Sequence, residues 1–204
     1  MTGVEALADA DRPVRRTVWR RMARTLRHLP DRLLHAWRRR QALTALQGRP
    51  LPRTVLIVCH GNICRSPYAA AALSHTLPAG VSHAVRVESA GFIGAGRPAP
   101  ADALTVAARH GLDLSRHRSA PLTRHNVRAA DLIVVMDVAQ RREIIGRFGR
   151  APGDVILLGD FDPAAIDTRT IRDPVEQPLD VFVESYSRID RCVSVLARAL
   201  ARLA

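Results

Sequence analysis

Cysteine is scarce in the sequence, and no long apolar run occurs in it. Three cysteines in 204 residues are too few for a disulfide framework, and an odd number cannot all pair within the chain. This scarcity favours a reducing compartment. No apolar run approaches the roughly 20 residues that a membrane-spanning helix needs. Arginine occupies the N-terminal region where a secretion signal would be apolar. The sequence therefore predicts a cytoplasmic protein whose thiols are available for chemistry.

Lysine is absent, and all 31 basic residues are arginine. Their charge is unevenly distributed, because residues 1–53 hold 13 arginines against four acidic residues, a net charge of +9 out of +12 for the chain. The basic character therefore belongs to the N-terminal quarter. No base-reading motif accompanies it, so nucleic-acid binding is not the expected role.

Metal-ligand spacings are also missing. The eight histidines contain no pattern such as His-Glu-x-x-His, and no internal repeat is present. We therefore expect neither a metal site nor another cofactor. The 47% of hydrophobic and 25% of charged residues are typical of a globular protein, and the length suits one α/β domain with an extension.

The N-terminal quarter predicts a basic, helical extension. Apolar residues recur there every three or four positions, the spacing of one helical face: Val18, Met22, Leu26, Leu29, Leu33 and Trp37. Pro30 predicts a break between two short helices, with Asp31 in the first turn of the second. The segment from Gly48 to Pro52 is typical of a linker.

These features divide the chain into an Arg-rich amphipathic extension with its linker, residues 1–52, and a single domain, residues 53–204. An Arg-rich amphipathic helix predicts peripheral contact of residues 1–47 with an anionic membrane surface. Packing against the main domain, disorder, and a translation start at Met22 are the alternatives.

From residue 53 onwards, short β-branched runs alternate with helical patterns. The predicted strands cover residues 54–59, 85–90, 131–136 and 155–158. The predicted helices cover residues 67–77, 101–110, 124–129, 138–147 and 179–203, with a polar loop over 162–178. This alternation predicts an α/β fold: one three-layer domain with a four-stranded parallel sheet flanked by helices. Such sheets bind ligands beyond the C-terminal ends of their strands.

A loop at that position carries the chemistry. It reads Cys59-His60-Gly61-Asn62-Ile63-Cys64-Arg65-Ser66-Pro67, and Pro67 suits the first position of a helix. Free backbone N–H groups and the positive end of the helix dipole meet there, so the Cys59 thiol is expected to ionise easily. The five residues between Cys59 and Arg65 can encircle a tetrahedral anion, which the guanidinium would grip. Gly61 and Asn62 tolerate the positive φ that so tight a loop requires.

This segment resembles the signature of the low-molecular-weight protein tyrosine phosphatases, in particular their bacterial branch. The resemblance is specific because the Cys-x5-Arg spacing occurs together with a strand before it, and a Ser-Pro pair and a helix after it. Further landmarks similar to those of the family follow in the family's order: Ser89-Ala90-Gly91, Gly96-Arg97-Pro98, His110-Gly111-Leu112, Asp131-Leu132-Ile133, Met136-Asp137 and Asp173-Pro174.

The resemblance implies hydrolysis of phosphotyrosine in proteins, without a metal, through a cysteinyl-phosphate intermediate. Cys59 would be the nucleophile, Arg65 the phosphate clamp and Asp173 the general acid, although Asp160, Asp162 and Asp167 compete for the last role. A bacterial tyrosine kinase is the partner that the bacterial branch implies, by analogy only.

The same resemblance implies a phosphate-binding loop made of His60, Gly61, Asn62, Ile63, Cys64, Arg65 and Ser66. Asn62 would hold a left-handed turn, and Ser66 would hydrogen-bond the Cys59 thiolate. His60 is expected at the rim of the loop. Cys64 is either a small core residue or, as in similar enzymes, a partner that forms a reversible disulfide with the oxidised nucleophile.

Three alternatives stay open at this point. Arsenate reductases of the same fold relay a disulfide through further cysteines on a mobile segment, and this chain has no cysteine there, since Cys192 is expected in the core of the last helix. Phosphoarginine-directed relatives typically carry Thr where Ile63 stands. A non-catalytic adaptor would have lost the nucleophile or the acid, and neither is lost.

The walls of the site differ from those of eukaryotic-type members, which follow Asp-Pro with aromatic residues. Here the sequence after Asp173-Pro174 is Val175-Glu176-Gln177-Pro178. Phe92 is a candidate for an aromatic wall on the other side, with packing in the core as its alternative.

Overall fold

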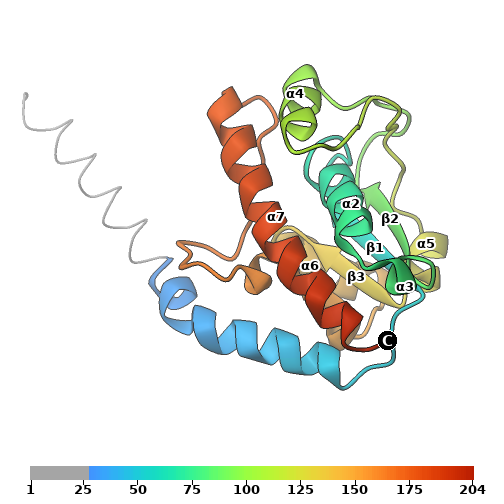
Figure 1. Cartoon of the computed structure of the whole chain (residues 1–204), viewed down its shortest axis with the longest axis vertical. Coiled ribbons are helices and arrows are strands. Elements are labelled where there is room, and N and C mark those ends of the chain that lie inside the picture. Colours follow the sequence, from blue (N-terminus) through green and yellow to red (C-terminus); the bar gives the residue numbers. More distant parts are fainter. Residues whose placement is uncertain (1–27) are drawn as a thin grey trace, which may run out of the picture.

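The computed structural model describes residues 28–204, which form a four-stranded sheet between two layers of helices (Figure 1). The strands are β1 (Thr54–Cys59), β2 (Arg86–Gly91), β3 (Leu132–Val135) and β4 (Val155–Leu157). All neighbours pair in parallel, in the order β2-β1-β3-β4. The predicted three-layer α/β domain with a four-stranded parallel sheet is confirmed.

Strand β1 is buried on both faces because it is an inner strand of the sheet and helices cover both faces of the sheet. Val55, Ile57 and Cys59 face the larger core, which includes α2 (Arg65–Thr76) and α7 (Leu179–Ala201). Leu56 and Val58 face the second core with α5 (Arg124–Ala129) and α6 (Val138–Phe148). Successive side chains of a strand point to opposite faces, so a doubly covered strand is apolar at every position.

The helices agree with the predicted ones except in two places. Helix α2 begins at Arg65 and not at Pro67, so Pro67 lies inside the first turn, where its missing N–H leaves no intrahelical bond unmade. Helix α3 (Ala79–Ser82) was not predicted, because one turn is too short to show a period. Helix α4 (Ala101–Arg109) and two short 3₁₀ turns, η1 (Pro152–Asp154) and η2 (Leu158–Phe161), complete this part.

Residues 28–47 form one helix that runs along the lower edge of the molecule in Figure 1. It is unbroken from residue 28 to residue 47, with Pro30 near its described start, and nearly all of the first of the two predicted helices falls outside the described residues. The predicted apolar positions Val18, Met22 and Leu26 lie outside the described residues.

This helix packs against the segment between β4 and α7. Leu46 is 2% exposed and belongs to the larger core. The buried His35 donates through Nε2 to the backbone oxygen of Asp162 at 2.9 Å. The backbone N–H of Arg169 donates to Asp31 at 3.2 Å. The helix is therefore attached to the segment that leads from β4 to α7. Across residues 28–204, no helix combines the length and the apolar character needed to cross a membrane.

Candidate active site

A small cavity of about 80 Å³ lies at the C-terminal ends of the strands. It joins the loop after β1, the loop after β2 and the loop before α7. Its lining residues are Cys59, His60, Gly61, Ile63, Cys64, Arg65, Ile93, Arg97, Asp173 and Val175. Cys59, Arg65 and Asp173 thus share one cavity although the last is more than 100 residues away in sequence. A parallel sheet brings them together, because its strands all end at one edge.

The Cys59 sulfur is held by two hydrogen bonds at the end of β1. The backbone N–H of Asn62 donates to Sγ at 3.3 Å, and the Ser66 hydroxyl lies 3.0 Å from Sγ. The Asn62 side-chain nitrogen donates to Ser66 Oγ at 2.8 Å. Since Ser66 accepts that hydrogen, its own hydroxyl hydrogen is free to point at the sulfur. Both contacts therefore supply donors to the thiol sulfur.

The orientation of the Asn62 amide is fixed from outside the loop. Its Oδ1 accepts the backbone N–H of Ala120 at 2.8 Å, so the other terminal atom must be the nitrogen. That nitrogen also donates to Ser89 Oγ on β2 at 2.9 Å. The Asn62 backbone has a φ of 51°, the left-handed turn that the resemblance implied. His117 Nε2 donates to its backbone oxygen at 2.7 Å.

Gly91, the last residue of β2, lets the loop approach the sheet. A Cβ atom at this position would lie 2.7 Å from the Asn62 nitrogen and 2.9 Å from Asn62 Cβ. Neither a backbone nitrogen nor a Cβ atom moves with a change of rotamer, so these contacts cannot be relieved in that way. Only glycine therefore fits where the loop crosses the end of β2.

Arg65 is buried at the bottom of the cavity and is 3% exposed. Its Nη1 donates to the Ile171 backbone oxygen at 3.1 Å, and its Nη2 pairs with Asp173 Oδ2. Ile171 is itself attached to the end of β3 through a hydrogen bond to the Met136 oxygen. The loop before α7 is thereby anchored at Ile171 and at Asp173, whose side chain remains 41% exposed at the mouth.

The other three candidate aspartates lie elsewhere. Asp162 is fully buried and pairs with Arg188 and Arg191. Asp160 pairs with Arg169, and the exposed Asp167 pairs with Arg32. Of the four aspartates, Asp173 alone lines the cavity.

Sequence reasoning missed the residues that form one wall of the cavity. Phe92 packs against the second core, so it is not a wall, and the neighbouring Ile93 lines the cavity instead. Arg97 also lines it, and its Nη2 donates to the backbone oxygens of Gly61 at 2.8 Å and Ile93 at 3.1 Å. The sequence signal for Arg97 was the landmark Gly96-Arg97-Pro98, in which Gly96 has a φ of 72°.

Cys64 lies on the floor of the loop and faces a stacked pair of tyrosines. Burial, followed by the nearby Cys59 and Asp173, raises the pKa of the Cys64 thiol to about 12. The Tyr186 hydroxyl donates to the Cys64 backbone oxygen at 3.2 Å, and its ring stacks on Tyr68 with centroids 3.7 Å apart. Tyr68 in turn donates to Asp190 on α7 at 2.8 Å. The last helix thus supports the loop from below.

Cys192 is fully buried in α7, as expected for a core residue. Burial raises the pKa of its thiol to about 12, with the Asp162 carboxylate as the next cause. In the described part of the chain, no group of three or more His, Cys, Asp or Glu side chains is arranged to hold a metal ion.

Comparison with known proteins agrees with this geometry. The family model described as low molecular weight phosphotyrosine protein phosphatase matches residues 54–203. The chain is 46% identical over 143 residues to the probable low molecular weight protein-tyrosine-phosphatase EpsP of Ralstonia nicotianae, covering 69% of this chain and 91% of that protein.

Two solved structures have the same fold. The YwlE arginine phosphatase of Geobacillus stearothermophilus has a TM-score of 0.65 at 30% identity and covers 74% of this chain and 94% of its own. Vibrio vulnificus Wzb in complex with benzylphosphonate has a TM-score of 0.63 at 31% identity, over 72% and 97% of the two chains. By its motif, its fold and these matches, the chain belongs to the low molecular weight phosphotyrosine protein phosphatases.

Proposed function

We propose that this protein hydrolyses phosphotyrosine in proteins, through a phosphorylated Cys59. The observation that carries the proposal is the shared cavity, which brings one sulfur, one buried guanidinium and one partly exposed carboxyl group together. In the first step the Cys59 sulfur attacks phosphorus, and the bond to the phenolic oxygen breaks. In the second step water attacks the cysteinyl-phosphate and releases inorganic phosphate.

The loop is built to stabilise negative charge. The first turn of α2 begins at Arg65, and first-turn N–H groups have no acceptor within their helix, so they are available to phosphate oxygens. The Arg65 guanidinium adds a fixed positive charge with two parallel donors. Oriented donors of this kind contribute about 3 to 4 kcal/mol each to stabilising a transition state.

Asp173 has the position of a general acid. It lies at the mouth of the cavity, where a leaving phenolic oxygen would emerge, and Asp173 Oδ1 also accepts the Val175 N–H at 3.3 Å. We assign to it protonation of the leaving oxygen in the first step and activation of water in the second. The contact with Arg65 holds the carboxyl group close to the bound anion.

Aliphatic walls favour an aryl phosphate as the group bound. Ile63, Ile93 and Val175 surround the polar base of the cavity. A relative, Vibrio vulnificus Wzb, has been solved with benzylphosphonate, in which a benzyl group is joined to phosphorus. Phosphoarginine is the second candidate, because the YwlE arginine phosphatase has the same fold. Ile63 argues against it, since an apolar side chain offers no hydrogen bond to a guanidinium.

The test compares two peptides of one sequence, one carrying phosphotyrosine and the other phosphoarginine, with no metal added. We expect kcat/KM to be at least tenfold higher for the phosphotyrosine peptide. Ile63→Thr should narrow that ratio, whereas Ile144→Val, which lies in the second core, should leave it unchanged. A higher kcat/KM for the phosphoarginine peptide would overturn the substrate assignment.

Arsenate reduction is the third candidate, and the cysteines argue against it. All three are accounted for: Cys59 and Cys64 lie in the loop, and Cys192 is buried in α7. A relay would need Cys192 to reach the loop, which requires α7 to leave the core. Thioredoxin-coupled arsenate turnover that is lost in Cys192→Ala would contradict this reasoning.

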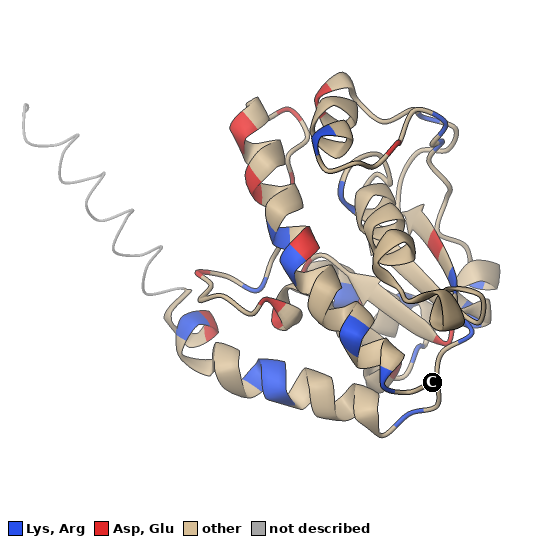
Figure 2. Ribbon diagram, viewed as in Figure 1, with Lys and Arg blue, Asp and Glu red and all other residues tan. Residues whose placement is uncertain are grey.

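For residues 1–52 we propose a role as a basic extension attached to a catalytic unit of residues 53–204. Its described part exposes an apolar strip: Leu33 is 72% exposed, Trp37 is 58% exposed, and they are four residues apart on one helical face. Basic positions recur along the same helix in Figure 2. This combination supports contact with an anionic membrane surface at the cytoplasmic side, where a membrane tyrosine kinase would be the partner.

A sedimentation assay tests the membrane contact. The full chain should bind vesicles that contain about 30% phosphatidylserine and should not bind vesicles of pure phosphatidylcholine. Leu33→Ser with Trp37→Ser should reduce that binding at least fivefold, while Leu104→Ser on α4 should not. Equal binding to both kinds of vesicle would contradict the electrostatic part of the proposal.

A further inference from the structure

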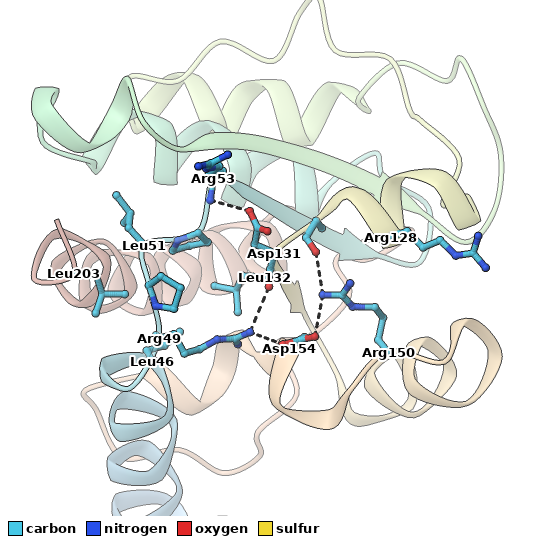
Figure 3. A pocket seen from close by; sticks show the side chains of 13 residues that line it. Leu46, Arg49, Leu51, Arg53, Arg128, Asp131, Leu132, Arg150, Asp154 and Leu203 are labelled. Carbon is cyan, nitrogen blue, oxygen red and sulfur yellow. Dashed lines mark hydrogen bonds and ion pairs between the residues drawn. The ribbon is translucent and has the colours of Figure 1, made fainter.

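A second and larger cavity, of about 560 Å³, lies at the opposite edge of the sheet (Figure 3). Three of its lining residues each lie immediately before a strand: Arg53 before β1, Asp131 before β3 and Asp154 before β4. The six residues of β1 separate this edge from Cys59 by about 20 Å. The cavity is therefore distinct from the catalytic site.

Arginine outnumbers the acidic residues around this cavity. Four arginines line it, at positions 49, 53, 128 and 150, against two aspartates. Asp154 is shared, because it pairs with both Arg49 and Arg150. Asp131 is engaged by the backbone, since its Oδ2 accepts the N–H groups of Arg53 at 2.8 Å and Thr54 at 2.9 Å. The lining residues therefore carry two more positive than negative charges.

Several of these guanidinium groups retain unused donors. The Arg53 side chain forms no hydrogen bond or ion pair with residues 28–204. The Nη1 of Arg150 likewise donates to no group within that range, whereas its Nε is buried and cannot reach a ligand. Arg128 extends from α5 at the rim and points away from the cavity in Figure 3. Arg49 and Arg150 point inwards, and their contacts with Asp154 fix their positions at the bottom of the view.

The remaining walls are apolar. Leu51, Leu132 and Leu203 stand on the side facing the end of α7, and Leu46 closes the cavity below them. Ligand cavities commonly measure about 300 to 1,000 Å³ and combine an apolar lining with a few polar groups. Both the size and the lining of this cavity fit that description.

The extension supplies part of the cavity. Leu46, Arg49 and Leu51 come before residue 54, where the family match begins. The cavity is consequently a joint feature of the extension and the catalytic domain. A ligand bound here would bridge the two.

We propose that this cavity binds a small organic anion that carries a phosphate or carboxylate group beside an apolar group. The anionic group would lie between Arg53 and Arg150, where unused N–H donors are available and a guanidinium can bind two oxygens at once. The apolar group would lie against Leu51 and Leu203. By holding Arg49 and Leu46 against the domain, such a ligand stabilises the attached state of the extension.

The experiment uses the full chain and the fluorescent probe 1-anilinonaphthalene-8-sulfonate, whose sulfonate stands in for the natural anionic group. We expect saturable binding at one site, and we expect 2-naphthoate to displace the probe. The uncharged 2-naphthol should not displace it, and sulfate should do so only at much higher concentration. Equal displacement by 2-naphthol would overturn the proposal, since charge would then play no part.

Two variants and a control locate the site. Arg53→Gln and Arg150→Gln should each weaken probe binding by about tenfold, as expected for loss of a charge-assisted hydrogen bond. Arg53→Gln removes an exposed side chain, so it keeps the test valid if Arg150→Gln fails to fold. Arg109→Gln on α4 is the matched control and should have no effect. Unchanged binding in Arg53→Gln, or competitive inhibition of aryl phosphate hydrolysis by the probe, would overturn the proposal.

Discussion

The two edges of the sheet differ in how their side chains are held, although within residues 28–204 both keep unpaired guanidinium nitrogens, Arg65 Nε and Arg97 Nε at the C-terminal edge and Arg150 Nε at the other. At the C-terminal edge, the Asn62 side chain alone makes three hydrogen bonds, to Ser66, Ser89 and Ala120, and its backbone makes two more. At the N-terminal edge, the Arg53 guanidinium has no partner in residues 28–204, and one aspartate serves two arginines. A closed network fixes geometry, whereas an open one leaves donors for another molecule.

This difference separates the two functions that we assign. Catalysis requires donors that are already in place before the reaction, because reorganisation would raise the barrier. A binding cavity needs only enough donors to recognise its ligand. Changes at the C-terminal edge should therefore alter kcat, and changes at the N-terminal edge should leave it unaltered.

The largest effect is expected for Cys59→Ser, which replaces the attacking sulfur. Hydrolysis of p-nitrophenyl phosphate should fall by at least about 10³-fold, because no covalent intermediate then forms at a useful rate. Cys192→Ser is the matched control and should retain activity, since Cys192 is buried in α7. Full activity in Cys59→Ser would remove the mechanism proposed here and, with it, the functional contrast between the edges.

Asp173→Ala should lower kcat by about 10²-fold, since general acid catalysis contributes roughly that amount. The loss should be greater for phenyl phosphate than for p-nitrophenyl phosphate, whose leaving group needs less protonation. Inhibition by vanadate should change little. Asp167→Ala, on the same loop but exposed, is the control. An equal loss for both substrates would argue against proton transfer by Asp173.

Asn62→Ala tests the closed network directly. The substitution removes the side-chain hydrogen bonds to Ser66, Ser89 and the Ala120 N–H, so we expect a loss of about 2 to 4 kcal/mol in the free energy of unfolding, together with a lower kcat. Urea denaturation and steady-state kinetics measure the two effects. Asn126→Ala, at the start of α5, should cost about 1 kcal/mol and leave kcat unchanged.

At neutral pH the smallest effect is expected from the buried thiols, whose contribution changes only in alkaline solution. Burial raises the pKa of Cys64 and Cys192 from 9.0 to about 12. Above pH 9 the unfolded chain loses these protons while the folded chain keeps them, so the free energy of unfolding should fall as the pH rises towards 12. Below pH 9 this contribution is fully present. In the Cys192→Ala variant the free energy of unfolding should fall less steeply between pH 9 and 11 than in the unmodified protein. The same slope in both proteins would contradict a raised pKa for the Cys192 thiol.

Much of the fold followed from local signals in the sequence. Strand β1 was predicted with both its ends, because a β-branched run between Arg53 and the loop leaves little choice. The four-residue α3 was not predicted, since a single turn has no periodicity. The packing of the helix over residues 28–47 was not predicted, because propensity alone carries no information on tertiary contacts such as the one between His35 and Asp162.

The candidate site was predictable to the extent that its residues are contiguous. The loop from Cys59 to Ser66 could be identified as a unit, and Asp173 needed the resemblance because several aspartates share its loop. Ile93 and Arg97 could not be assigned in the same way, because their positions depend on how the segment after β2 folds back over the loop. A segment that folds back over a distant loop shows no periodic pattern of apolar residues from which the contact could be predicted.

Leu46 lies in the larger core, eight residues before the family match begins. The segment that unfolds as one unit can therefore begin before the segment that matches the family. A protein shortened to the residues that match the family would expose Leu132 and Leu203 to solvent, where they line the cavity with Leu46. Residues 28–52 should accordingly melt together with the enzyme in a single calorimetric transition.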